Sequence, residues 1–399
     1  MIMWGGLSWV GENVSFRACG INSTIKPVTK HRSPVWPRGL LLMFVGAALL
    51  SGLLAGLTLL GVWADTPAAS LGADHGALMV FGFVGGAIGL ERTVAAKTRW
   101  SWVGPVASAL GVVTLLAGAP RIVPAAAFTV AFLVLGAVYL IIHRRQATHA
   151  VLVQSAGVIG AVFATVWWGG GADFADIVPA AVVFAVATII GERMELARVS
   201  FAGTAAETTI TALILALVAA CLLFALHPQI GFAAMGVLLL AIAVVTVRID
   251  VARRLVHAGK LPKYTAVCML AGYGWLAVAG LLWLGFGHTR AGHLHDAAVH
   301  SVFLGFVVSM IFAHAPFILG GVIRKTIPYH PALYVPVVLL HGGLALRVVA
   351  DLRAAGPAWV AGGVINVVAV LLFAVTGFIL VTTDRRRRRA ARERRSARV

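Results

Sequence analysis

Charged residues are scarce in this sequence, and acidic residues are the scarcest among them. Aspartate, glutamate, lysine and arginine together make up 12% of the 399 residues, whereas a typical soluble domain carries about 25%. Hydrophobic residues reach 60%. This composition excludes an ordinary soluble globular protein and indicates a polytopic membrane protein.

Cysteine is nearly absent as well. The three cysteines, Cys19, Cys221 and Cys268, lie far apart along the chain. A disulfide framework needs paired cysteines, and a zinc site needs ligands at short, regular spacings. The sequence therefore predicts neither.

Basic residues outnumber acidic ones by 32 to 14, and the formal net charge is +18. If this charge were spread over a folded surface, it would suggest a nucleic-acid partner. Much of it lies instead in Arg385–Arg398, and most of the remainder lies in short loops. Such a distribution is typical of membrane proteins, in which basic loops set the topology and attract anionic lipid. We expect the lipid bilayer as a partner and no nucleic acid.

The two ends of the chain differ from its middle. Residues 1–38 are polar, carry Lys26, Lys30 and Arg32, and contain no long apolar run, which excludes both a cleavable signal and a span. We interpret them as a disordered cytoplasmic extension or as an over-extended start of the reading frame. Residues 39–383 then form the membrane domain, and residues 384–399 form a basic cytoplasmic tail.

Long apolar runs fill the membrane domain. About 20 apolar residues cross the hydrocarbon of a bilayer as a helix. The connections between the runs are short, so no large soluble domain is inserted. The predicted fold class is all-α, with twelve transmembrane helices. The predicted spans are Leu40–Trp63, Ala73–Ala95, Ser101–Ala117, Ile122–Ile142, Val151–Trp168, Phe174–Ile190, Thr208–Leu226, Ile230–Val247, Tyr264–Phe286, Asp296–Gly320, Tyr334–Val349 and Trp359–Val381.

Alternate loops differ in charge. One set holds most of the basic loop residues, whereas the other set holds only Arg121, Arg290 and Arg353, beside several aspartates. Because basic loops stay in the cytoplasm, this asymmetry predicts that both termini are cytoplasmic. Because an even number of crossings returns the chain to the side on which it began, twelve spans also place both termini on one side of the membrane. We therefore predict a multi-pass protein of the cell membrane.

Spans two, six and ten align with one another without gaps. Glu91 in span two falls on Glu192 and on His314 in this alignment. Short apolar matches also arise by chance among valine-rich helices, and the recurring polar residue argues against chance. We predict three arcs of four helices in a pseudo-threefold arrangement, with these polar residues at similar depth. The matching triplets are Gly82-Phe83-Val84, Val183-Phe184-Ala185 and Gly305-Phe306-Val307.

Histidines gather at the outer ends of spans two and ten. His75 lies at the start of span two, and the stretch His293–Gly321 begins with His293, His295 and His300. Both helices run from outside to inside, so His75 and His300 should differ in height by no more than about one turn. They differ by two positions in the alignment, or about 200° of rotation, and so would present opposite faces to a flat group between them.

These histidines are candidate haem ligands. A haem ligand is a neutral imidazole on a rigid element, with its other nitrogen held by an acceptor. Asp74 and Asp296 are nearby acceptors of the right kind. The alternative is that the histidines bond only to neighbouring helices or backbone carbonyls. The predicted cofactor-binding residues are His75 and His300, with His295 or His293 in place of His300 as the other choice.

A second polar level lies near the cytoplasmic ends of the spans. The pairs Glu91–Arg92 and Glu192–Arg193 are ordinary anchors where helices leave the membrane, or else they form a buried ion-pair network or a proton path. His314 and His341 are candidate ligands of a metal or a second haem, or else they are core histidines bonded to their neighbours. No catalytic residue is predicted, and neither an enzyme nor a non-enzyme is favoured.

Several of these segments resemble known families. One resemblance, to the NnrS family, rests on VHSVFLGFVVSMIFAHAP, on IPYHPALYVP and on LLHGGLALRV, and is best over His300–Arg347. NnrS proteins are described as twelve-helix membrane proteins that contain haem and copper and are linked to nitric oxide metabolism. DHGALMVFGF around His75 resembles the second helix of the haem–copper oxidase catalytic subunit, where a histidine followed by glycine binds low-spin haem. The triplet His293-Leu294-His295 resembles the paired histidines of that subunit's tenth helix.

The resemblance implies a haem-binding scaffold of twelve helices in three arcs, with a role in the nitric oxide response or in electron transfer. The implied partners are haem and a small gas or a redox partner. The oxidases bind copper through histidines on their sixth and seventh helices. Span six here offers Glu192 and Arg193 but no histidine, which argues against copper and against oxygen reduction.

A transporter is the competing class. Intramembrane charge, internal repeats and frequent glycines also mark carriers of small molecules or metals, whose sites lie at the midplane beside broken helices. Here the polar residues lie towards the two surfaces, which favours a cofactor scaffold. A membrane-embedded stress-response or assembly protein without turnover is a third reading. An absorption spectrum separates a haem protein from a carrier.

Overall fold

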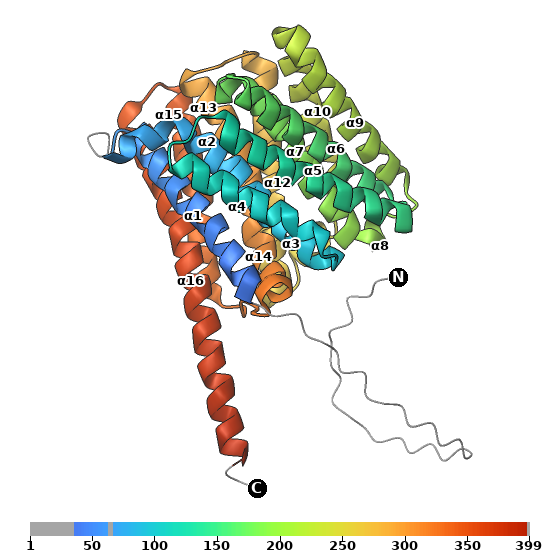
Figure 1. The fold of residues 1–399 in the computed structure, drawn as a ribbon, viewed down its shortest axis with the longest axis vertical. Coiled ribbons are helices and arrows are strands. Elements are labelled where there is room, and N and C mark those ends of the chain that lie inside the picture. Colours follow the sequence, from blue (N-terminus) through green and yellow to red (C-terminus); the bar gives the residue numbers. More distant parts are fainter. Residues whose placement is uncertain (1–35, 63–66, 397–399) are drawn as a thin grey trace. The chain divides into compact units, whose positions relative to one another are not determined.

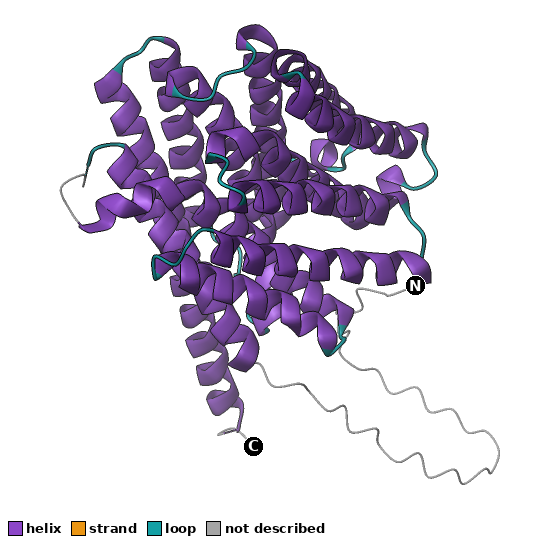
Figure 2. Ribbon diagram, turned by 45° about the horizontal axis from the view of Figure 1, so that its top comes forward, coloured by secondary structure: helices purple, strands orange, loops and turns teal. Residues whose placement is uncertain are grey.

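The protein is described here from a computed structural model, which covers residues 36–62 and 67–396. Every regular element in these two ranges is a helix, and the helices are joined by short loops (Figure 2). The predicted N-terminal extension lies outside the described residues up to position 35, and so does Cys19. Cys221 and Cys268 are buried and free.

The helical elements follow one another in the order shown in Figure 1. The first half contains α1 (Trp36–Leu59), the 3-10 helix η1 (Pro67–Asp74), α2 (His75–Ala77), η2 (Leu78–Gly85), α3 (Gly86–Ala96), η3 (Trp100–Trp102), α4 (Val103–Leu116), α5 (Ile122–Arg145), α6 (His149–Gly169), α7 (Phe174–Leu196) and α8 (Arg198–Phe201). The second half contains α9 (Ala205–Leu226), α10 (Pro228–Ile249), α11 (Ala252–Leu255), α12 (Lys260–Phe286), α13 (Gly292–His300), η4 (Ser301–Val308), α14 (Ser309–Ile323), η5 (Pro331–Leu333), α15 (Tyr334–Leu352) and α16 (Gly356–Ser396).

Eleven helices within the described residues are long and apolar enough to cross a membrane. The predicted third span, Ser101–Ala117, corresponds to the apolar but shorter helix Trp100–Leu116. The all-α polytopic membrane fold is thus confirmed, whereas the count of twelve spans and the direction in which they cross stay predictions. The last span, Gly356–Arg385, belongs to a helix that continues to Ser396.

Helix α7 is the most deeply buried span. In its most apolar window 83% of the residues are buried, against 33% in α1. A helix that is apolar on all sides belongs in the interior of a bundle. Its last turns touch the two helices with which span six was aligned, because Glu192 lies 3.8 Å from Arg92 of α3 and Arg193 lies 3.1 Å from His314 of α14. The three aligned spans are therefore neighbours, while the threefold relation itself stays a prediction.

Spans two and ten share a departure from α-helical geometry. Both contain an eight-residue π-helical segment, Leu78–Gly85 in η2 and Ser301–Val308 in η4. These segments begin and end at matching positions when Gly82 is aligned with Gly305. π-Helical turns are rare and are often found at functional sites. Each segment follows closely after one of the predicted ligands, His75 or His300.

Small residues bring α6 and α7 close together. A Cβ atom added to Gly160 would lie 2.5 Å from the carbonyl oxygen of Ala180, and one added to Gly191 would lie 2.8 Å from that of Ala150. No side chain fits at either position. Close backbone approach through small residues is a common way to pack helices in membranes, where lipid supplies no hydrophobic driving force.

Candidate functional site

The polar residues of the described spans fall into two groups. We call the end that bears His75, His293, His295 and His300 the histidine end. The group that contains Arg92 and Arg193 is called the arginine end. The candidate functional site lies at the histidine end.

His75 is the first residue of α2, directly after η1. Its Nδ1–H donates a hydrogen bond of 2.8 Å to the carbonyl oxygen of Gly52 on α1. Because a carbonyl oxygen only accepts, the neutral ring carries its proton on Nδ1 and leaves the lone pair on Nε2. Glycine at position 56 lets α1 approach this ring, since a Cβ there would lie 3.1 Å from Cε1 of His75.

His300 is the last residue of α13. Its Nδ1–H points to the carbonyl oxygen of Asp296, at 3.0 Å, and lies 3.2 Å from Oδ1 of the same residue. The neutral tautomer is therefore the same as in His75, with the lone pair on Nε2. Neither Nε2 has a hydrogen-bond partner among the described residues.

The two imidazoles lie side by side although 224 residues separate them in the chain. Their ring centroids are 6.3 Å apart and their planes differ by 28°. Since an imidazole nitrogen binds a metal at about 2.0–2.1 Å and lies about 1.1 Å from its ring centroid, two imidazoles on opposite sides of one metal have centroids about 6.3 Å apart. The observed spacing, between two rings that are nearly parallel, therefore leaves room for one metal between them.

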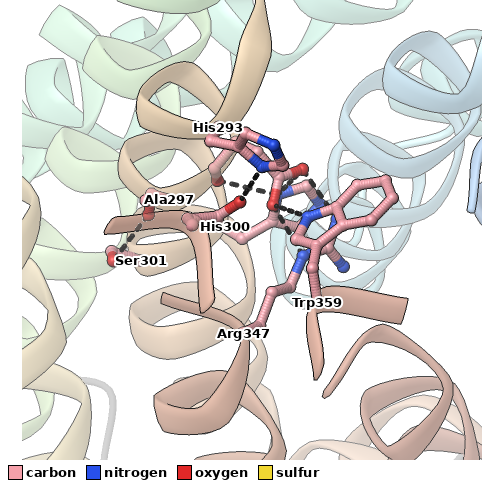
Figure 3. Close-up of polar contacts among 8 residues, drawn as sticks. His293, Ala297, His300, Ser301, Arg347 and Trp359 are labelled. Carbon is pink, nitrogen blue, oxygen red and sulfur yellow. Dashed lines mark hydrogen bonds and ion pairs between the residues drawn. The ribbon is translucent and has the colours of Figure 1, made fainter. Parts of the chain in front are cut away.

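Asp296 connects His300 to two further helices, from which Arg347 and Trp359 reach towards the same place (Figure 3). Arg347 of α15 donates from Nε and Nη2 to the two carboxylate oxygens, at 2.6 and 2.7 Å. The indole N–H of Trp359, on α16, donates to Oδ2 at 3.0 Å. The guanidinium carbon of Arg347 also lies 5.5 Å from the Trp359 ring centroid. Bidentate, charge-assisted pairing of this kind fixes both position and charge of the carboxylate.

His293 and His295 have partners of their own. His293 donates from Nδ1 to Oδ1 of Asp351, at 3.0 Å, and the Asp351 side chain is fully buried. His295 donates from Nδ1 to the carbonyl oxygen of Thr289, at 2.9 Å. Both rings line the same cavity as His300, but the ring contact to His75 involves His300. Of the alternatives that the sequence left open on span ten, the geometry favours His300.

A cavity of about 500 Å³ lies against these rings. Small-molecule and cofactor sites span about 300–1,000 Å³ and are mostly apolar with a few placed polar groups. This one has apolar walls from α1, η2, η4 and α16, and a polar rim from α13 and α15. The residues that define it include Leu53, Val80, Phe303 and Val367 on the walls and Asp296 and Arg347 at the rim.

At the arginine end the polar side chains pair with one another. Arg92 is 8% exposed and lies 3.1 Å from Glu91, 3.0 Å from Glu195 and 3.8 Å from Glu192. Gln154 donates a further bond of 3.1 Å to Glu195. The contacts of Arg92 are ion pairs, and conduction of protons through this group stays a prediction.

Arg193 forms a second buried pair. It donates from Nε and Nη2 to both oxygens of Asp250, at 3.2 and 3.1 Å, and Asp250 also accepts from the Tyr273 hydroxyl at 2.7 Å. From Nη1 it donates to Nε2 of His314, at 3.1 Å, while His314 Nδ1 donates to the Met310 carbonyl at 2.7 Å. Both nitrogens of His314 are therefore used within the protein.

His341 is satisfied in the same way. Its Nδ1 accepts from the indole N–H of Trp275 at 3.0 Å, and its Nε2 lies 3.3 Å from the Ser309 hydroxyl. These contacts favour a structural role for His314 and His341, and metal binding by them stays a prediction. No group of three or more histidine, cysteine or carboxylate side chains arranged for a metal ion occurs in the part of the chain that the structure describes.

The sequence predicted some of the groups that hold the histidine rings in place and missed others. Asp296 was expected as the acceptor for His300, and it is. Asp74 was expected for His75, but the acceptor is the Gly52 carbonyl, because α1 passes closer to the ring than the preceding turn does. Arg347 and Trp359 were missed. Only the positive charge inside span eleven marked Arg347, and nothing in the sequence marked Trp359.

The comparisons with known proteins return one match. The model of a family described as a domain of unknown function (DUF8744) matches residues 38–382. No curated protein and no solved structure matches the chain.

Proposed function

The chain belongs to the family DUF8744, and from the geometry of the histidine end we propose that it is a membrane protein that holds one haem between His75 and His300. The observation that carries the proposal is the pair of imidazoles, 6.3 Å apart, each with its Nδ1–H engaged. That leaves Nε2 of each ring as the ligand atom. Histidine ligands of metals are usually held in this way by an acceptor at the other nitrogen.

The donor set and the cavity fit a porphyrin. The apolar walls suit its ring and keep water away from the two ligands, while Arg347 at the rim suits its carboxylates. Nη1 of Arg347 has no hydrogen-bond partner among the described residues, because Asp296 takes Nε and Nη2. Asp296 holds the His300 ring in orientation. Bound haem supplies a one-electron centre whose potential the protein tunes through ligands and hydrogen bonds.

The resemblance to the NnrS family suggests the biological setting. It implies a role in the nitric oxide response or in electron transfer, with a small gas or a redox partner. A haem with two protein ligands suits electron transfer directly, since both coordination positions are filled. We therefore propose electron transfer or gas sensing rather than oxygen reduction, and we do not include copper.

A transporter remains the alternative, and the cavity is the observation that favours it. A space of about 500 Å³ with an arginine at its rim also suits a small amphipathic anion. This alternative predicts a colourless protein in which His75 and His300 are not required for binding.

The test is an absorption spectrum of the purified protein with its haem content. We expect a Soret band and the sharp bands of low-spin haem on reduction. The variants His75→Ala and His300→Ala should each abolish the low-spin spectrum. The matched control is His149→Ala, because His149 on α6 bonds to Thr211 and not to the cavity. A wild-type protein that contains no haem when it is produced with haem available would refute the proposal.

We further propose that the protein lies in the cell membrane with both termini cytoplasmic. The charge difference between alternate loops supports this orientation. Reporter fusions after Gly170 and Gly287 should read as external, and fusions after Arg145 and Arg254 as cytoplasmic. Two or more fusions on the wrong side would contradict it.

A further inference from the structure

The two imidazoles at the histidine end are held unequally. His75 donates to one neutral backbone carbonyl, that of Gly52. His300 faces a carbonyl and also a carboxylate, with Nδ1 3.2 Å from Oδ1 of Asp296. A carboxylate behind a ligating histidine raises the donor strength of the opposite ring nitrogen more than a neutral acceptor does. Nε2 of His300 is therefore the stronger donor of the two.

The carboxylate behind His300 is itself fixed as an anion. It accepts two bonds from Arg347 and one from Trp359, so three donors from two other helices hold its charge in place. Charge-assisted bonds are shorter and stronger than neutral ones. Moving His300 away from its position would disturb this whole group.

His75 has less to hold it. Its ring is held by a single backbone carbonyl of a neighbouring helix, whereas the His300 ring is held by both the carbonyl and the carboxylate of Asp296. Displacement of His75 breaks one neutral hydrogen bond.

We propose that His300 is the permanent ligand of the bound haem and that His75 is the exchangeable one, so that a small diatomic gas binds on the His75 side. The inference rests on the proposed function. If haem is bound, Nε2 of His300 would hold it throughout, and Nε2 of His75 would hold it until the gas takes that place. No electron or proton is transferred. Asp296 is a positioning residue in this scheme, since it acts through His300.

The test is the rate at which the dithionite-reduced protein binds carbon monoxide. The wild type should bind carbon monoxide slowly, at a rate that does not rise in proportion to gas concentration, because departure of His75 limits the reaction. His75→Ala should retain haem and bind the gas at least tenfold faster. His300→Ala should lose most of its haem. The opposite pattern, or a wild type that never binds carbon monoxide, would overturn the inference.

Asp296→Asn provides a second measurement. Its result would not change if Asp296 served only to stabilise the fold. Loss of the carboxylate weakens the donor opposite the gas, so the C–O stretching frequency should rise and the reduction potential should become more positive. Asp296→Glu should return both values part of the way. An unchanged frequency in Asp296→Asn would overturn the inference, and this result decides the matter if both histidine variants lose haem. Absence of haem from the wild type would instead mean that the proposed function has failed.

Discussion

The histidine end and the arginine end use their polar side chains in opposite ways. At the arginine end His314 has a protein partner at each ring nitrogen, Met310 at one and Arg193 at the other. At the histidine end, within the described part of the chain, His75 and His300 each have a partner at Nδ1 only. Polar groups shielded from solvent are normally hydrogen-bonded, so a half-buried ring with one nitrogen left over, beside a cavity, points to a ligand.

The same contrast holds for the acidic residues. Asp250 is fully buried and accepts from Arg193 and Tyr273, both within the protein. Asp296 is also paired with an arginine, but it additionally lies behind a histidine that faces the cavity. One carboxylate stabilises a junction between helices, and the other serves a ring that has a free nitrogen. The comparison suggests that the arginine end carries stability and the histidine end carries binding.

The largest effect on stability is expected at the arginine end. Arg193→Ala leaves Asp250 buried without its cation, and breaking a buried pair from one side costs about 3–5 kcal/mol. Thermal unfolding in detergent should show a large fall in midpoint. The matched control is Arg290→Ala, whose side chain is 53% exposed and pairs with Asp176; an exposed pair of this kind contributes about 0–1 kcal/mol. Equal effects of the two substitutions would contradict the assignment.

One variant from each end, measured for both stability and haem spectrum, tests the division of roles between the two ends. His314→Ala leaves Nη1 of Arg193 without an acceptor and should cost about 1–3 kcal/mol in unfolding free energy, with the haem spectrum kept. His75→Ala should abolish the low-spin spectrum but cost less stability in the haem-free form, because it removes a single hydrogen bond to a neutral backbone carbonyl. If both variants lost stability and spectrum to the same degree, the division of roles would be wrong.

The smallest effect concerns the indole that bonds to Asp296. Trp359→Phe removes one donor but leaves the two bonds from Arg347, so the expected cost is about 1–1.5 kcal/mol, at or below the lower end for a bond to a charged group. Thermal unfolding measures this, and redox titration should show a small shift towards positive potential. Trp100→Phe, at a tryptophan that is 39% exposed, should change neither. A loss as large as that of Arg193→Ala would mean that Trp359 supports the fold and not the site.

Much of the site followed from the position of residues along single helices. His75 and His300 could be placed at the same end of adjacent spans, with their side chains on opposing faces, because helical rise and rotation convert sequence spacing into height and direction. Asp296 could be expected behind His300 because residues four apart share a helix face. Predictions of this kind need no knowledge of which helices touch.

The remaining partners could not be predicted in this way. Gly52 lies on α1, Arg347 on α15 and Trp359 on α16, and each reaches the site only because those helices pack against α2 or α13. The pairing of Arg193 with Asp250 was missed for the same reason, since Asp250 lies just beyond α10.

The sequence by itself determined that this is a helical membrane protein, because apolar run length and charge content are local properties that a bilayer selects directly. It also determined which histidines share an end of the bundle. Only the tertiary structure decided which nitrogen of each ring stays without a partner, and that a carboxylate held by Arg347 and Trp359 lies behind one ring while a backbone carbonyl lies behind the other. The physical reason is that hydrogen-bond satisfaction depends on groups distant in the chain, whose approach is set by side-chain packing between helices.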